Sequence, residues 1–456
     1  MSTERRQIPP LEIPITLRRL LTVLVCLMGL ALASCNSGNG VGATPNLTRV
    51  RVINLVPNAP SIQVSVDNDA PFVSGLQFQQ LTQYLDVIKG INPGVHEFKV
   101  SADGGLTNVI DVHLTLGTAV DYTFVVYGPV ETIAQALLLD TNTLIPNGGT
   151  FDVRVANVAT GISAVDVYFT SPGVDLTFAA PAVQLVAIGA ISGYFPTATI
   201  DGDVEMRITV AGSKEVIYDA MVPTFADKSL AQVIVFGKGS ARLVNAAVLN
   251  LDDTGTGLVA DSTLSEIKVL NGTSLGAPLN VFVDGNLTLA NIPFGGVSNY
   301  EPVPTGTRTI TVQSAATPGA TLLTVETTLA SATDTSIAVS GSAGALRSLV
   351  LTDNNLPSAI GRARVRFVNA SPDLAAMDVY VNFVKVFTNV ASNAASPYSE
   401  IVADINGTIY EFDFNVAGTV TPVLKLPGIT INSGKTYTIY VVGSAAAPQG
   451  VVSNDH

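Results

Sequence analysis

The chain has 456 residues, of which 13% are charged, and its formal net charge is −13. An acidic balance without a basic run argues against nucleic acid as a partner, because binding it requires positive charge that neutralises phosphates. The charged share is about half of the ~25% found in ordinary domains, and the many Val, Ala, Thr and Gly residues favour β-structure over long solvated helices.

The chain begins with a candidate export signal. Arg18 and Arg19 precede an uncharged apolar run over residues 20–33, which is closed by the small residues of Leu32-Ala33-Ser34-Cys35. This order is typical of a secretory signal. A transmembrane helix is the alternative, but a run of 14 residues is shorter than the ~20 needed to span a bilayer. A twin-arginine signal is a weaker alternative, because the rest of that pattern is absent.

The four closing residues resemble the lipobox of bacterial lipoproteins. The resemblance implies that Cys35 carries a diacylglyceryl group and becomes the new N-terminus, with residues 1–34 as the lipoprotein signal peptide and 35–46 as a lipidated cysteine and flexible tether. The membrane is then a partner through the lipid on Cys35. By resemblance to enterobacterial sorting rules, Asn36 in place of Asp implies the outer membrane of the cell envelope if the host is Gram-negative. With Cys26 removed and Cys35 lipidated, we expect no disulfide.

The rest of the chain contains four internal repeats. Each repeat opens with a strand that ends in asparagine: Asn54, Asn157, Asn271 and Asn369, which lie 103, 114 and 98 residues apart. A tyrosine follows each asparagine after 30, 37, 29 and 29 residues: Tyr84, Tyr194, Tyr300 and Tyr398. A closing strand of each repeat ends near a glycine: Gly128, Gly237, Gly341 and Gly443. A period of about a hundred residues indicates an array of domains and not a solenoid.

Within each repeat the apolar residues alternate with polar ones. Val50 and Val52 alternate with Arg49 and Arg51, which predicts antiparallel strands with one face buried and one face in water. About seven such runs per repeat predict an all-β chain of tandem immunoglobulin-like antiparallel β-sandwich domains. The predicted domains are residues 47–146, 147–262 (the most divergent), 263–356 and 357–456, with linkers at 147–149, 252–262 and 354–358.

Two of the repeats resemble a known family. Repeat 4 contains Arg362-Ala-Arg-Val-Arg-Phe-Val-Asn-Ala-Ser-Pro-Asp373 and Met377-Asp-Val-Tyr-Val381, and repeat 3 contains Val283-Asp-Gly285, Val297-Ser-Asn-Tyr300 and Pro304-Thr-Gly-Thr-Arg-Thr-Ile-Thr-Val312. These segments are similar to the bacterial domain-of-unknown-function 4397 family. The resemblance is looser in repeat 1 and weakest in repeat 2, where residues 171–186 replace a short hairpin. It implies secreted, often lipid-anchored β-sandwich repeats with no assigned activity and no catalytic residues to transfer.

The repeated asparagines and tyrosines are the candidate site residues. The asparagines lie on the same face as the buried valines, so we expect their amides to bond the backbone of the next turn. We expect the tyrosines to be half-buried, with hydroxyls bonded to backbone. A ligand-binding role is the alternative for both sets.

Residues suited to catalysis or metal binding are scarce. His96 and His113 are expected on separate strands without a zinc pattern. Aspartates cluster at 67–69, 201–203 and 252–253, but without the spacing of a calcium loop. Gly255-Thr-Gly257 only loosely mimics a dinucleotide loop, since no βαβ unit surrounds it. We therefore predict no catalytic residues, no metal and no cofactor.

The leading hypothesis is a lipid-anchored, non-enzymatic binding or scaffold array that contacts an envelope protein or polymer. One equivalent strand position is expected to be exposed and to vary among the repeats, as Gln63, Asp166, Asn280 and Asp378. The alternative is a carbohydrate-binding module array, although the chain has no Trp for sugar stacking.

Overall fold

The computed structural model describes residues 48–59, 61–67, 69–84, 91–102, 107–140, 145–237, 242–251 and 256–455. The predicted signal peptide, Cys35 and the predicted tether lie outside these residues. Within the described part, the chain is built of β-strands and one short 3-10 helix, η1 (Val130–Thr132), so the all-β fold class is confirmed. No helix in this part is long and apolar enough to span a bilayer.

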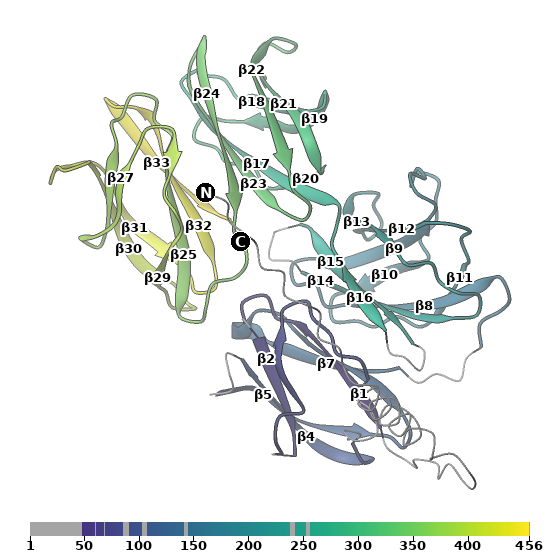
Figure 1. The fold of residues 1–456 in the computed structure, drawn as a ribbon. Coiled ribbons are helices and arrows are strands. Elements are labelled where there is room, and N and C mark those ends of the chain that lie inside the picture. The colour runs from purple at the N-terminus through teal and green to yellow at the C-terminus, as the bar shows by residue number, and fades with distance from the viewer. Residues whose placement is uncertain are drawn as a thin grey trace, which may run out of the picture. The chain divides into compact units, whose positions relative to one another are not determined.

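Each repeat folds into two facing sheets (Figure 1). Repeat 1 has one sheet of three strands and one of four, in the orders β1 (Arg49–Leu55), β6 (Asp121–Tyr127), β7 (Ala134–Leu139) and β3 (Val73–Gln77), β2 (Ser61–Val66), β4 (Gly94–Ala102), β5 (Thr107–Leu116). Repeat 2 has sheets in the orders β11 (Phe195–Ala198), β8 (Thr150–Asn157), β14 (Leu230–Gly237), β15 (Val244–Asn250), β16 (Gly257–Ala260) and β10 (Val183–Ala187), β9 (Ala164–Thr170), β12 (Val204–Val210), β13 (Val216–Val222).

Repeats 3 and 4 follow the same plan. The sheets of repeat 3 have the orders β20 (Glu301–Pro304), β17 (Leu264–Thr273), β23 (Asp334–Ser342), β24 (Ala345–Asp353) and β19 (Asn286–Ile292), β18 (Leu279–Val283), β21 (Gly306–Ser314), β22 (Thr321–Leu329). Repeat 4 has β28 (Ala394–Ala395), β25 (Arg362–Asn369), β32 (Thr436–Ser444), β33 (Ala447–Asn454), with β29 (Ser399–Val402) also on β25, and then β27 (Val384–Val390), β26 (Met377–Val381), β30 (Thr408–Val416), β31 (Pro422–Ile431).

The space between the two sheets of each repeat is a separate apolar core. In repeat 1, Val52 and Phe124 from one sheet pack with Val64 and Phe98 from the other, and the two phenyl rings lie 5.2 Å apart between centroids. The inward residues are those of the period-two pattern, so the predicted sandwiches are confirmed. Burial of such side chains stabilises each domain by ~1.5–3 kcal/mol per large residue.

One strand pair in each repeat is parallel. The opening strand runs parallel to the strand before the last hairpin, in the pairs β1–β6, β8–β14, β17–β23 and β25–β32. The alternation of side chains is the same in parallel and antiparallel strands, so the sequence pattern did not reveal this pairing.

The predicted linker at 252–262 is partly wrong. Residues Gly257–Ala260 form β16, which pairs antiparallel with β15 at the edge of the repeat 2 sheet. The small and aliphatic residues of this segment complete a sheet, and Gly257 therefore lies in a strand and not in a phosphate-binding loop.

The prediction that the first strands expose one face is also wrong. Arg51, Lys268 and Arg366 are 0%, 2% and 3% exposed, although they lie on the face opposite the valines. That face packs against the neighbouring repeat. One apolar cluster contains residues of repeats 1 and 2, among them Ile53, Val125, Ile234 and Phe236; a second contains residues of repeats 3 and 4: Leu270, Ala338, Val368, Ala370, Tyr440 and Val442.

The four repeated asparagines join the two sheets of their own domains. Each is fully buried, and its amide nitrogen donates to a carbonyl in the edge strand of the opposite sheet: Asn54 to Leu76, Asn157 to Val186, Asn271 to Ile292 and Asn369 to Val390, at 2.8, 3.0, 2.9 and 3.3 Å. In three repeats the amide oxygen accepts a backbone N–H two residues later. Apart from a hydroxyl contact of Asn271, the described contacts of these asparagines are with backbone, which fits a structural role.

The asparagines of repeats 3 and 4 differ in how fully they are bonded. The Asn271 oxygen accepts from the Thr273 amide at 3.1 Å and from its hydroxyl at 2.8 Å. The Asn369 oxygen has no hydrogen-bond partner among the described residues. Asn271 therefore contributes more to its domain.

We expect Asn271→Ala to destabilise repeat 3 by ~1–3 kcal/mol, since buried backbone groups lose their partners, and Asn369→Ala to destabilise repeat 4 by less. Native-state hydrogen exchange on the mature chain, read on β17–β19 and β25–β27, measures both effects. Unchanged protection in the Asn271 variant would show that the amide does not hold the sheets together.

Candidate functional site

A buried cation stands three residues before each repeated asparagine. These cations are Arg51, Arg154, Lys268 and Arg366. In every repeat the charged group lies over the ring of the repeated tyrosine, Tyr84, Tyr194, Tyr300 and Tyr398, at 4.7, 5.1, 4.7 and 4.8 Å from its centroid. A cation over an aromatic face is attracted by the ring quadrupole, most strongly where water is excluded. The spacing of asparagine and tyrosine therefore preserves a cation–π pair.

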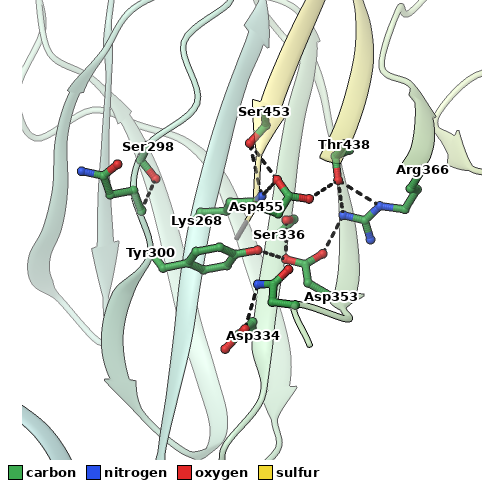
Figure 2. A network of polar contacts seen from close by, with 12 residues as sticks. Lys268, Ser298, Tyr300, Asp334, Ser336, Asp353, Arg366, Thr438, Ser453 and Asp455 are labelled. Atoms are coloured by element: carbon green, nitrogen blue, oxygen red, sulfur yellow. Dashed lines mark hydrogen bonds and ion pairs between the residues drawn. The ribbon is translucent and has the colours of Figure 1, made fainter. Parts of the chain in front are cut away.

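Repeats 3 and 4 form two reciprocal ion pairs across their interface, as Figure 2 shows. Lys268 of repeat 3 forms an ion pair with Asp455 of repeat 4. Arg366 of repeat 4 pairs with Asp353 of repeat 3, with 2.6 Å between nitrogen and oxygen. We call these four residues and Tyr300 the 3/4 cluster.

Each carboxylate of the 3/4 cluster is also held by hydroxyls of its own repeat. Asp353 accepts from Tyr300 at 2.6 Å and from Ser336 at 2.5 Å, and Asp455 accepts from Thr438 at 2.5 Å. Thr438 in turn accepts a bond of 2.9 Å from Arg366. The hydroxyls aim each carboxylate at the cation of the other repeat, as the dashed contacts in Figure 2 show.

Burial decides the ionisation of this cluster. It raises the pKa of Tyr300 far above its usual range, and Asp353 raises it further, so this phenol stays protonated and donates. Burial lowers the pKa of Arg366, but Asp353 together with Tyr398, Tyr440 and Asp455 outweighs it, so the net direction is upward. Tyr300 therefore remains a neutral donor and Arg366 remains charged.

Repeats 1 and 2 meet through one shared carboxylate, in a set that we call the 1/2 cluster. Asp140 pairs with Arg51 of its own repeat and with Arg154 of repeat 2, both at 3.2 Å, and accepts from Tyr84 at 2.6 Å and Thr123 at 2.5 Å. Burial raises the pKa of Asp140, while Arg51, the two hydroxyls and Arg154 oppose that shift.

Repeat 2 lacks the second carboxylate. By register, the position that corresponds to Asp140, Asp353 and Asp455 is Leu251. Two polar contacts serve instead: Arg154 donates to Gln232 at 2.5 Å, and Arg51 donates to the Asn250 carbonyl at 3.3 Å. Arg51 and Arg154 therefore both keep hydrogen-bond partners, although repeat 2 supplies no carboxylate at this position.

The expected role of the tyrosine hydroxyls needs correction. Tyr84 and Tyr300 donate to carboxylates and not to backbone, while Tyr398 accepts a backbone bond from Asn354 at 3.4 Å. The cations and the terminal aspartates were not among the predicted site residues. The cations keep a constant spacing from the repeated asparagines, and the aspartates keep one from the closing glycines. This spacing is the sequence signal that could have identified them.

A second correction concerns the position expected to be exposed and variable. Asp166 and Asp378 are buried, while Gln63 and Asn280 are half-buried. Asp166, Asn280 and Asp378 accept the backbone N–H of a residue with positive φ in the next strand: Leu185, Asn291 and Asn389. These side chains fix a β-bulge, so they are not free for contact with a partner.

The remaining candidates do not assemble into a catalytic group. His96 and His113 lie on the neighbouring strands β4 and β5, and His96 contacts Asp67 at 2.5 Å. Asp201 and Asp203 are exposed, and Asp252 and Asp253 lie outside the described residues. In the part of the chain that the structure describes, no three His, Cys, Asp or Glu side chains are placed to hold a metal.

One carboxyl group has a strongly shifted acidity. Burial, helped by the nearby Glu205, raises the pKa of Asp219 to about 6. Glu205 is itself paired with Arg207 at 3.2 Å and accepts the Gly173 amide at 3.0 Å. Glu205, the neighbour of Asp219, is therefore held in place by contacts within repeat 2.

A polar cleft of about 580 Å³ lies beside the 3/4 cluster. Its lining includes Lys268, Tyr300, Asp455 and the exposed Asn299 and Asn454. The charged groups of this lining are already paired, so amides and hydroxyls are the groups it offers to a ligand.

We expect Arg366→Ala to destabilise the paired repeats 3 and 4 by ~3–5 kcal/mol, because Asp353 would remain as an uncompensated buried charge. Glu411→Ala removes an exposed pair with Lys425, which keeps its pair with Asp413, and serves as the control, with little change expected. Urea unfolding of the mature chain, followed by hydrogen exchange in β24 and β25, compares them. Equal stability of the two variants would contradict a role of the buried pair.

Comparison with solved structures gives only remote likenesses. A family 26 carbohydrate-binding module of Eubacterium rectale Amy13K, solved with maltoheptaose, is 12% identical, with 45% of this chain and 99% of that chain covered and a TM-score of 0.16. The Bacillus anthracis TIE protein is 9% identical, with 94% and 79% covered and a TM-score of 0.15. TM-scores this low support no inference from these structures to this chain. No curated protein matches the chain by sequence.

A family match covers most of the chain. Residues 48–168, 265–380 and 363–456 match the family described as "Domain of unknown function (DUF4397)". The matches include repeats 1, 3 and 4 and the opening strands of repeat 2, and they confirm the tandem organisation. The chain therefore belongs to the DUF4397 family.

Proposed function

We propose that this protein is a lipid-anchored component of the cell envelope, whose four sandwiches form a non-enzymatic scaffold for an envelope protein or polymer. The observation that carries the proposal is the mutual pairing of buried charges in the 1/2 and 3/4 clusters. These groups are aimed at each other across repeat boundaries, where they fix which faces meet.

A scaffold function explains why so many polar groups are buried without forming a reactive site. A general base must reach a substrate proton, and a nucleophile needs an adjacent base. In the described residues, the carboxylates and cations of the clusters instead bond each other and neighbouring hydroxyls. Their contribution is to hold domains in register, which is what a presenting surface requires.

The pairing of repeats suggests where the array can be divided. A chain ending at residue 262 keeps the whole 1/2 cluster, and its removed part keeps the whole 3/4 cluster. We expect capture of envelope partners by residues 36–262 to be weaker than by residues 36–456, but graded, and unaffected by EDTA. Complete loss on truncation, or loss on chelation, would instead indicate a single metal-dependent site.

The proposed anchor rests on Leu32-Ala33-Ser34-Cys35. We expect Cys35→Ala to abolish incorporation of a palmitate analogue and to leave the precursor unprocessed, because the thiol is the acceptor of the lipid. Cys26→Ala is the matched control and should incorporate label normally. Full labelling of the Cys35 variant would exclude this anchor.

A neutral glycan is the second candidate partner, and the polar cleft beside the 3/4 cluster favours it. Its exposed amides, Asn299 and Asn454, suit hydrogen bonding to sugar hydroxyls. A glycan array probed with the mature chain and with the Asn299→Ala variant distinguishes this function. Sugar-specific retention that the variant loses would support it.

A further inference from the structure

An exposed phenylalanine occupies a glycine position in repeat 4. Phe383 lies at the tip of the β26–β27 hairpin, with a φ of +70° and 78% of its surface exposed. The matching hairpin of repeat 3 turns at Asp284 and Gly285, and Gly285 has a φ of +84°. A bulky side chain in this backbone region is unfavourable and here gains no burial in return. The fold of repeat 4 therefore gives no reason for the ring.

Phe383 belongs to a group of exposed apolar residues at one end of repeat 4. Val384, Val402, Ile405 and Ile409 are each more than half exposed. The hairpin tip is fixed to β30 by reciprocal bonds between Asn382 and Glu411, at 2.8 and 2.9 Å. The Tyr410 hydroxyl then joins β30 to the Val402 carbonyl. We call these five apolar residues the apolar end.

Two cations near the apolar end are paired within the domain, while the exposed Arg362 lies opposite Val402 in the register of β25 and β29. Lys385 bonds Asp378 at 2.7 Å, and Lys425 bonds Glu411 at 2.8 Å. The end therefore offers aliphatic and aromatic surface beside one exposed guanidinium group. Aliphatic side chains contribute little to sugar stacking, and protein hot spots favour Trp, Tyr and Arg. Projecting Phe, Val and Ile side chains instead match the apolar region just below lipid headgroups.

We propose that the apolar end of repeat 4 inserts into the interface of a lipid bilayer. Its use in the cell rests on the proposed envelope location, where a lipid on Cys35 raises the local concentration of the array near the membrane. The contact itself depends only on residues of repeat 4. Because apolar side chains make the contact, binding should occur on neutral lipid, and the exposed Arg362 beside the end should strengthen it on anionic lipid at low salt.

The test uses the unacylated chain, residues 36–456, with neutral phosphatidylcholine vesicles in a flotation assay. We expect wild-type protein to float with the vesicles. The Phe383→Gly variant should partition onto vesicles at least about tenfold more weakly, as loss of one buried aromatic side chain implies. The same variant should be at least as stable as the wild type, because glycine suits the turn. A loss of binding with unchanged or higher Tm separates contact from folding.

Val420 provides the matched control. It is 91% exposed in the turn after β30, at the opposite end of the same sandwich. Val420→Ser should float like the wild type. No flotation of the wild-type chain, or equal flotation of the Phe383→Gly variant, overturns the proposal. Loss of glycan retention or of self-association in that variant, with vesicle binding intact, assigns the tip to a sugar or a second copy and also overturns it. Palmitate labelling at Cys35 is independent of all these outcomes.

Discussion

A buried positive charge must be paired, and this constraint organises the chain. Every repeat places a cation on the outer face of its first strand, where the neighbouring repeat excludes water. An ion left alone there would cost several kcal/mol, so the repeats that meet must supply its carboxylate. Repeats 3 and 4 do so reciprocally, whereas repeats 1 and 2 share Asp140. Apolar packing of the same faces holds the neighbouring repeats together, and the charge pairs fix how the two faces align.

The sequence predicted the individual sandwiches well because their determinants are local. The alternation in Val50 and Val52, and the asparagine at each strand end, depend on residues within one repeat. An inward amide must bond nearby backbone, which predicted the contacts of its oxygen with the next turn but not the bonds that its nitrogen donates to the opposite sheet. The all-β class and the family followed from the same patterns.

The contacts between repeats were missed because they join distant parts of the chain. Arg51 looked like an ordinary solvent-facing residue beside Val50, since alternation reports only that two faces differ. The run Val233-Ile-Val-Phe236 carried the better signal, because continuous apolar strands are typically buried on both faces. The partner of Lys268 is Asp455, which no local pattern connects to it.

The account can be tested most directly at Asp455, whose charge crosses from repeat 4 to repeat 3. Asp455→Asn leaves the side-chain shape and removes the counter-charge of Lys268. Native-state hydrogen exchange on the mature chain should then show that β17 in repeat 3 loses protection together with β32 in repeat 4. If β32 alone responds and β17 keeps its wild-type protection, the repeats are independent domains, and charge pairing does not organise the array.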